Sequence, residues 1–235
     1  MATRINGPEA EWSAGRDPER LLTGYPHPLG ERKLRLLGCG CCRAVWDRFI
    51  DDRSRKAVEV VERFADGLAT VSDMEAAGED ASAADVHAFS TISTHGRRRA
   101  QFGWRTAWAA YTLTNIPPGP DPLPTVLDDL ITALDQLQYT RRGDIRRVRA
   151  AQADLVRDVF GDPFRPAALN TAWSTPTVVA LARGIYADRA FDILPILADA
   201  LEEAGCEDEP LLRHCRAGGP HVRGCWVVDL VLGKM

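Results

Sequence analysis

The chain has 235 residues and a formal net charge of −4; 45% of its residues are hydrophobic and 26% are charged. These values fit one large domain with a core of normal size. The mild acidity disfavours nucleic acid and anionic membranes as general partners.

Several features of the sequence bear on the compartment and source of the protein. No run of about 18 apolar residues occurs, so we expect no transmembrane helix and no membrane partner. The N-terminal sequence MATRINGPEAEW lacks the apolar core of a signal peptide. We therefore predict a cytoplasmic protein in which the six cysteines stay reduced. Arginine supplies nearly all the positive charge, which we interpret as a bacterial coding bias.

The first half of the chain has helical patterns and no hairpin signals. Asp17 and Pro18 form an N-cap and first-turn pair that predicts a short helix. The next helix is stronger, because its apolar residues fall at steps of three and four and share one face. They are Leu34, Leu37, Cys41, Val45 and Phe49. Further helices are expected over 57–68 and, in an alanine-rich stretch, after Ser72.

The second half continues as helices separated by loops. The helical segments predicted there are 97–113, 125–137, 148–160, 176–186, 191–201, a short piece at 211–212, and 222–232, which is apolar enough to be mostly buried. The segment 116–124 contains five prolines and must be a loop. We predict an all-α fold over 1–235, a single multi-helix bundle with an irregular aromatic and arginine-containing loop near 161–173. The proline-rich loop 116–124 is a candidate lobe boundary.

Metal-binding residue types gather at the C-terminal end. The candidates are Cys206, His214, Cys215, His221 and Cys225. A zinc site needs four nitrogen or sulfur ligands, and structural sites usually bring two of them together on a tight turn. No Cys-x-x-Cys pair occurs, and adjacent residues rarely bind one ion. The pattern therefore favours core cysteines and hydrogen-bonded histidines over zinc, which remains the alternative.

A cysteine nucleophile is a further interpretation of the same residues. It would require a thiolate activated by a histidine within hydrogen-bond reach. Cys225 lies next to Trp226 in an apolar stretch, which raises the pKa of a thiol and argues against reactivity. No glycine-flanked nucleophile motif is present. The sequence therefore disfavours a cysteine hydrolase.

A candidate anion site surrounds the Gly218–Pro220 break. If a helix began near His221, its free N–H groups could bind an anion. Arg216 and Arg223 flank this position and could hold a phosphate or a carboxylate. The structural alternative is a simple turn whose arginines pair with acidic residues of the chain. That alternative is favoured, although Arg216, His221 and Arg223 are the best anion candidates in the sequence.

Two other patterns are most simply structural. The GCGCC run at 38–42 falls within a predicted helix, so we expect close helix–helix packing through its glycines and cysteines. Arginines at 97–99 precede Trp104 and Trp108, a mixture found in proteins that bind single-stranded nucleic acid. Solvated helix faces with buried tryptophans explain it better in an acidic chain, so we expect no nucleic acid partner.

Several segments together resemble a known family. They are ERKLRLLGCGCCRAVW (31–46), DRSRKAVEVVERFADG (52–67), FGDPFRP (160–166), TPTVVALARGIY (175–186), FDILPILADALEEAGC (191–206) and HCRAGGPHVRGCWVVDLVLGK (214–234). They are similar to a bacterial all-helical family to which no function has been assigned. The resemblance implies a complete chain whose C-terminal block is a defining part of the fold. It supplies no catalytic or binding residues.

Two functions compete on these observations. A full helical core without an assembled catalytic set indicates a non-enzymatic binding or regulatory module that acts through contacts with other proteins. The alternative is a metal- or anion-dependent enzyme or sensor centred on the C-terminal histidines, cysteines and arginines. Zinc is the metal that would suit the second function.

Overall fold

The fold is all-α. The computed structural model describes residues 7–90, 97–116 and 144–234, and every regular element within these ranges is a helix. The helices are α1 (Pro8–Ala14), α2 (Pro18–Thr23), α3 (Glu31–Arg43), η1 (Trp46–Arg48), α4 (Asp52–Ala65), α5 (Val71–Ser90), α6 (Arg97–Thr114), α8 (Asp144–Phe160), η2 (Thr171–Trp173), α9 (Pro176–Asp188), η3 (Phe191–Ile193), α10 (Leu194–Glu203), α11 (Glu209–Arg216) and α12 (Trp226–Leu232). This confirms the predicted class. No helix within the described ranges has both the length and the apolar character that a bilayer crossing requires.

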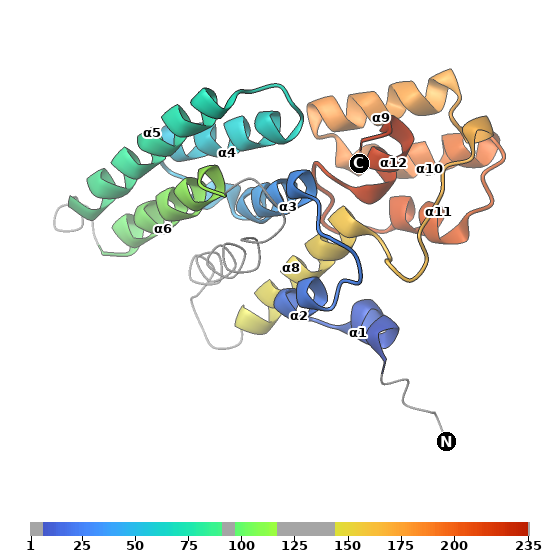
Figure 1. The fold of residues 1–235 in the computed structure, drawn as a ribbon, viewed down its shortest axis with the longest axis horizontal. Coiled ribbons are helices and arrows are strands. Elements are labelled where there is room, and N and C mark those ends of the chain that lie inside the picture. Colours follow the sequence, from blue (N-terminus) through green and yellow to red (C-terminus); the bar gives the residue numbers. More distant parts are fainter. Residues whose placement is uncertain (1–6, 91–96, 117–143, 235) are drawn as a thin grey trace.

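The helices form two groups. Figure 1 shows α4, α5 and α6 side by side at one end of the molecule and α9 to α12 at the other. Between them, α3 packs against α4, α6 and α8. Buried apolar side chains accordingly form two clusters, one from α1 to α8 and one from α9 to α12. The chain passes from the first cluster to the second after Phe160. Apart from Ile116, the proline-rich loop 116–124 lies outside the described residues.

The irregular segment 161–173 connects the two clusters. It contains no α-helix and ends in the short helix η2. Phe164 packs against the first cluster, and Trp173 packs against the second. Gly161 begins the segment with φ of +69°, a left-handed conformation that ends α8 and that glycine adopts without strain. The sequence predicted this loop correctly.

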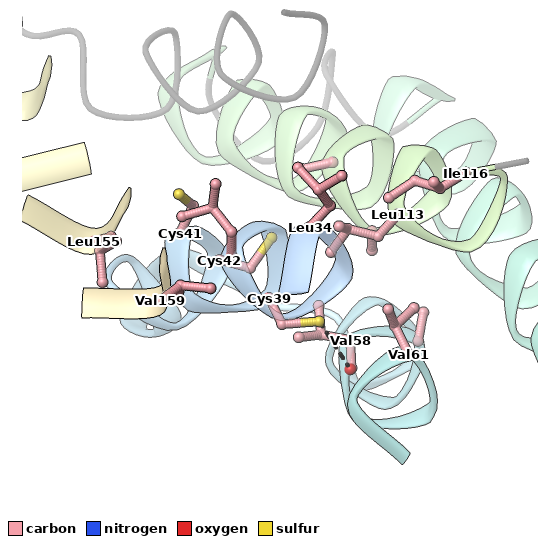
Figure 2. Packing of buried hydrophobic residues seen from close by; sticks show 14 of the residues in the cluster. Leu34, Cys39, Cys41, Cys42, Val58, Val61, Leu113, Ile116, Leu155 and Val159 are labelled. Atoms are coloured by element: carbon pink, nitrogen blue, oxygen red, sulfur yellow. Dashed lines mark hydrogen bonds between the residues drawn. The ribbon is translucent and has the colours of Figure 1, made fainter. Parts of the chain in front are cut away.

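The centre of the first cluster is α3. Its predicted apolar stripe is buried, and so are the neighbouring cysteines. Figure 2 shows Cys39 and Cys42 among apolar side chains of α3, α4 and α8. The Cys39 thiol donates a weak hydrogen bond to the carbonyl oxygen of Val58, over 3.7 Å. The helix ends at Arg43, earlier than the stripe suggested, but Phe49 beyond it is still fully buried.

Glycines let a C-terminal loop lie directly on α3. A Cβ atom on Gly40 would come within 2.9 Å of Val222 Cγ2. Gly224 has φ of +92°, and a Cβ there would lie 3.0 Å from Cβ of Leu36. The sequence predicted close packing at Gly40, but its partner is a loop residue instead of another helix. The loop that carries His221 is thereby held against the first cluster.

The last helix is shorter than predicted. It begins at Trp226, not near His221 or Val222, because the left-handed conformation of Gly224 cannot belong to an α-helix. Val227 and Val231 are buried as expected from their apolar surroundings, whereas Trp226 is only half-buried. The idea of a helix N-terminus at His221 is therefore wrong.

A buried polar network joins the two clusters. The guanidinium of Arg32 on α3 donates to both carboxylate oxygens of Asp229 on α12, at 2.6 and 3.1 Å. It also donates to Asp66 over 3.2 Å and to the Tyr186 hydroxyl over 2.9 Å. Burial alone would raise the pKa of Asp66, but hydrogen bonds from Tyr186 and Lys234 outweigh it and lower the pKa. Burial raises the pKa of Asp229.

Candidate metal centre

Four metal-ligating side chains converge between the two clusters. They are Asp158, His214, His221 and Cys225, and one potential ligand atom from each lies within 4.8 Å of all the others. The side chains of Asp158 and His221 are 3% and 7% exposed, and Cys225 is fully buried. The group is thus closed off from bulk water, with the edge of His214 as its most exposed part.

Each of the four residues comes from a different piece of backbone. Asp158 lies in the last turn of α8, on the side of the helix that carries Leu155. His214 lies in the last turn of α11. His221 belongs to the loop that rests on α3, and Cys225 is the N-cap residue of α12. The site therefore forms only when α8 of the first group meets the C-terminal block.

The distances are close to those of a tetrahedral centre. Nε2 of His214 lies 3.1 Å from Oδ1 of Asp158 and 3.3 Å from Sγ of Cys225. Nδ1 of His221 lies 2.6 Å from the same Asp158 oxygen. Ligand atoms around a tetrahedral zinc ion are about 3.3–3.6 Å apart, given the usual bond lengths. The ligand atoms lie between 2.6 Å and at most 4.8 Å apart, so side-chain shifts of about 1 Å would give this spacing.

Backbone groups orient the ligands. Nε2 of His221 lies 3.0 Å from the carbonyl oxygen of Ala217. A bound metal would displace the Nδ1 proton that otherwise bonds to Asp158, while Nε2 keeps its proton on the Ala217 carbonyl, as is usual for metal-binding histidines. The second oxygen of Asp158 accepts a hydrogen bond from the N–H of Val222 over 2.9 Å. Backbone groups thus fix two of the four ligand side chains, His221 and Asp158.

The pKa shifts of the cluster show that a metal would have to displace protons from Cys225 and His221. Burial raises the pKa of the Cys225 thiol well above its usual range, and the nearby Asp158 raises it further. Burial alone would raise the pKa of Asp158, but hydrogen bonds from His214 and His221 lower it. Burial would lower the pKa of His221, and the bond to Asp158 instead raises it. The carboxylate is therefore ionised, and the thiol would need a bound cation to ionise.

The geometry does not fit a cysteine nucleophile. In a catalytic triad, the nucleophile and the carboxylate contact opposite nitrogens of the histidine ring. Here Cys225 and Asp158 both approach Nε2 of His214. A raised pKa and full burial also keep the Cys225 sulfur protonated and out of reach of a substrate.

The structure groups three of the five residues that the sequence suggested for a metal. His214, His221 and Cys225 come together, whereas Cys206 and Cys215 lie in the second hydrophobic cluster. Burial raises the pKa of the Cys215 thiol to about 12. Asp158 was not among the predicted metal ligands. Its signal was an acidic residue three positions after Leu155, on the apolar side of an amphipathic helix.

The three candidate anion-binding residues have separate partners. Arg216 pairs with Asp199 at 2.9 Å and with Glu202, on the exposed side of α11. His221 faces the metal-ligand cluster. Arg223 donates through Nε and Nη2 to two backbone carbonyls near the end of α9. Without a helix start at His221, the three side chains do not meet at one point: His221 and Arg223 border the same cavity, and Arg216 lies apart from them.

Comparison of the chain with protein-family models, with curated proteins and with solved structures finds no match.

Proposed function

We propose that this protein is a metal-dependent helical module in which a zinc ion, bound by Asp158, His214, His221 and Cys225, fastens the C-terminal block to α8. The observation that carries the proposal is the convergence of one carboxylate, two imidazoles and one thiol from four separate backbone segments. Hydrogen-bonding needs alone do not require this combination of ligand types at one buried point.

The ligand set favours zinc on chemical grounds. Imidazole and thiolate ligands suit borderline transition metals, and tetrahedral sulfur and nitrogen sites are typical of zinc. A thiolate and a carboxylate supply two negative charges, which balance a divalent cation. The buried site would then carry no net charge, and this avoids the large cost of an unpaired buried ion.

Four protein ligands give the ion a structural role. Catalytic zinc keeps an open position for water or substrate, whereas structural zinc is closed. The proposal is therefore compatible with a non-enzymatic binding or regulatory module that acts through protein contacts, which remains a prediction. All six cysteines are free and buried, which supports the predicted cytoplasmic location.

Metal analysis of the untagged protein tests the proposal. We expect about one zinc per chain by mass spectrometry, and visible absorption typical of a tetrahedral cobalt–thiolate site after cobalt substitution. The Cys225→Ala variant should lose both signals. Cys215→Ala is a matched control, because Cys215 is equally buried and lies outside the cluster. Failure of the wild-type protein to take up stoichiometric metal after reconstitution, or equal loss in both variants, would refute the proposal.

A further inference from the structure

A second polar cluster lies where the end of α9 and the loop before α12 meet α3 and α4. Arg43, Glu62, Arg189 and Arg223 border a cavity there of about 200 Å³, which Phe191 helps to close. This volume is below the about 300–1,000 Å³ of sites for drug-sized ligands. A small ligand, or one group of a larger ligand, would fill it.

The cluster carries an excess of positive charge. The buried carboxylate of Glu62 accepts two hydrogen bonds from Arg43, each 3.0 Å long. It accepts another from Arg189. Nη1 of Arg223 lies 4.0 Å from the same carboxylate. Three guanidinium groups therefore share one buried carboxylate, which leaves two positive charges in excess. Glu59 lies 3.6 Å from Arg43, but its side chain is 52% exposed, so water screens it.

The three arginines differ in how fully they are engaged. Arg43 uses Nε and Nη2 on Glu62, and its guanidinium also stacks over Trp46 with 3.8 Å to the ring centroid. It therefore serves mainly to hold the carboxylate. Arg223 is anchored by its Nε and Nη2 donors, so that Nη1 is the group nearest to Glu62. Arg189 and Arg223 are the arginines with donors left for a ligand.

Arg189 has an unusual backbone and an unusual side chain. It ends α9 with φ of 54° and ψ of 34°, a left-handed conformation that normally belongs to glycine or asparagine. Its Nε is buried and has no hydrogen-bond acceptor among the described residues. A buried donor without an acceptor is costly. An arginine that occupies a position suited to glycine and borders a cationic cavity indicates a role for its side chain.

We propose that this cavity binds a phosphate group. A phosphate carries about −1.5 to −2 charges at neutral pH, which matches the excess of two positive charges. Its tetrahedral oxygens accept hydrogen bonds from several directions, as donors on two separate arginines require. One oxygen would accept a hydrogen bond from the guanidinium of Arg189, and another would face Nη1 of Arg223. The site is independent of the proposed metal, although His221 borders both.

Titration calorimetry of the full chain with inorganic phosphate, at constant ionic strength in chloride, tests the proposal. We expect saturable binding of one phosphate and at least tenfold weaker binding by Arg189→Gly, because charged hydrogen bonds are lost. Glycine suits φ of 54°, so this variant removes the guanidinium without straining the end of α9. Arg223→Gln should weaken binding in the same way. Arg183→Ala removes an exposed arginine from the same helix and should bind as the wild type does.

Three results would overturn the proposal. One is the lack of saturable binding by the wild-type protein, and another is equal affinity of Arg189→Gly and wild type. The third is binding that disappears in Cys225→Ala and persists in Arg189→Gly, since the phosphate would then sit on a metal ion. A parallel titration with methyl phosphate identifies the source. Tighter binding than inorganic phosphate assigns the site to a phosphorylated small molecule, and weaker binding assigns it to the free ion; both support a phosphate site.

Discussion

Replacement of Arg32 by methionine should destabilise the protein more than the removal of any solvent-exposed charged side chain. The methionine keeps the apolar stem of the side chain but removes a guanidinium that binds two carboxylates, Asp66 and Asp229. Each carboxylate side chain is only 2% exposed. Lys234 still pairs with Asp66 over 3.1 Å, whereas the nearest remaining cation to Asp229 is Lys33, at 3.9 Å. The main cost is therefore an uncompensated charge on Asp229.

The expected magnitude follows from this geometry. Removal of one partner from a buried ion pair typically costs about 3–5 kcal/mol. The whole stability of a domain is about 5–15 kcal/mol, so the change would use a large part of it. With a urea m-value of about 2–3 kcal/mol per molar, the unfolding midpoint of Arg32→Met should fall by about 1–2 M. Circular dichroism during urea titration measures this shift.

Two variants complete the test. Arg20→Met changes an arginine that is 74% exposed and lies 4.0 Å from Asp17, so we expect a loss below about 0.5 kcal/mol. Arg32→Met combined with Asp229→Leu removes the buried charge together with its partner and should be more stable than Arg32→Met alone. A loss below about 1 kcal/mol in Arg32→Met, or no recovery in the double variant, would refute the reasoning.

Three further predictions concern other parts of the fold. The lowered pKa of Asp66 means that its stabilisation is complete above the ordinary aspartate pKa of about 3.9 and is lost as the pH falls toward the folded value. The melting temperature of Asp66→Asn should thus fall less steeply than that of the wild type below about pH 4. Gly40→Ala should lose about 1 kcal/mol in urea titration, because the clash with Val222 exceeds the gain in helix propensity; equal or greater stability would contradict this. A Cys39→Ala, Cys42→Ala double variant should keep its metal content, and rapid labelling of either native thiol would argue against inert packing.

Amphipathic periodicity was sufficient to predict the fold class. The stripe from Leu34 to Phe49 is buried because residues at steps of three and four share one helix face, and this is a local property. The predicted cap at Asp17 is also a local feature, because its side chain accepts a hydrogen bond from the backbone N–H of Glu19, two residues later. The exact end of α3 was harder to predict, because residues beyond the end of the helix, such as Phe49, are also buried.

The metal centre could be predicted only in part. His214, His221 and Cys225 lie close in sequence, so their proximity was visible. Asp158 is 56 residues before His214, and its contribution depends on how α8 packs against the C-terminal block. That packing is a tertiary property that periodicity does not encode. An acidic residue on an apolar helix face was the available signal, because a buried carboxylate requires a partner.

The C-terminal loop explains why stability alone is a poor test for the metal. A loop without regular structure must find other partners for its buried backbone groups. Here the Val222 N–H donates to Asp158, and the Ala217 carbonyl pairs with His221. Substitution of either ligand would remove a backbone partner as well as a metal ligand, so the protein would lose stability whether or not it binds zinc. The sulfur of Cys225, by contrast, takes its backbone hydrogen bonds from the N–H groups of Val227 and Val228, at the start of its own helix. Metal content and the cobalt spectrum of the Cys225→Ala variant therefore separate a ligand from a structural side chain, which a melting temperature does not.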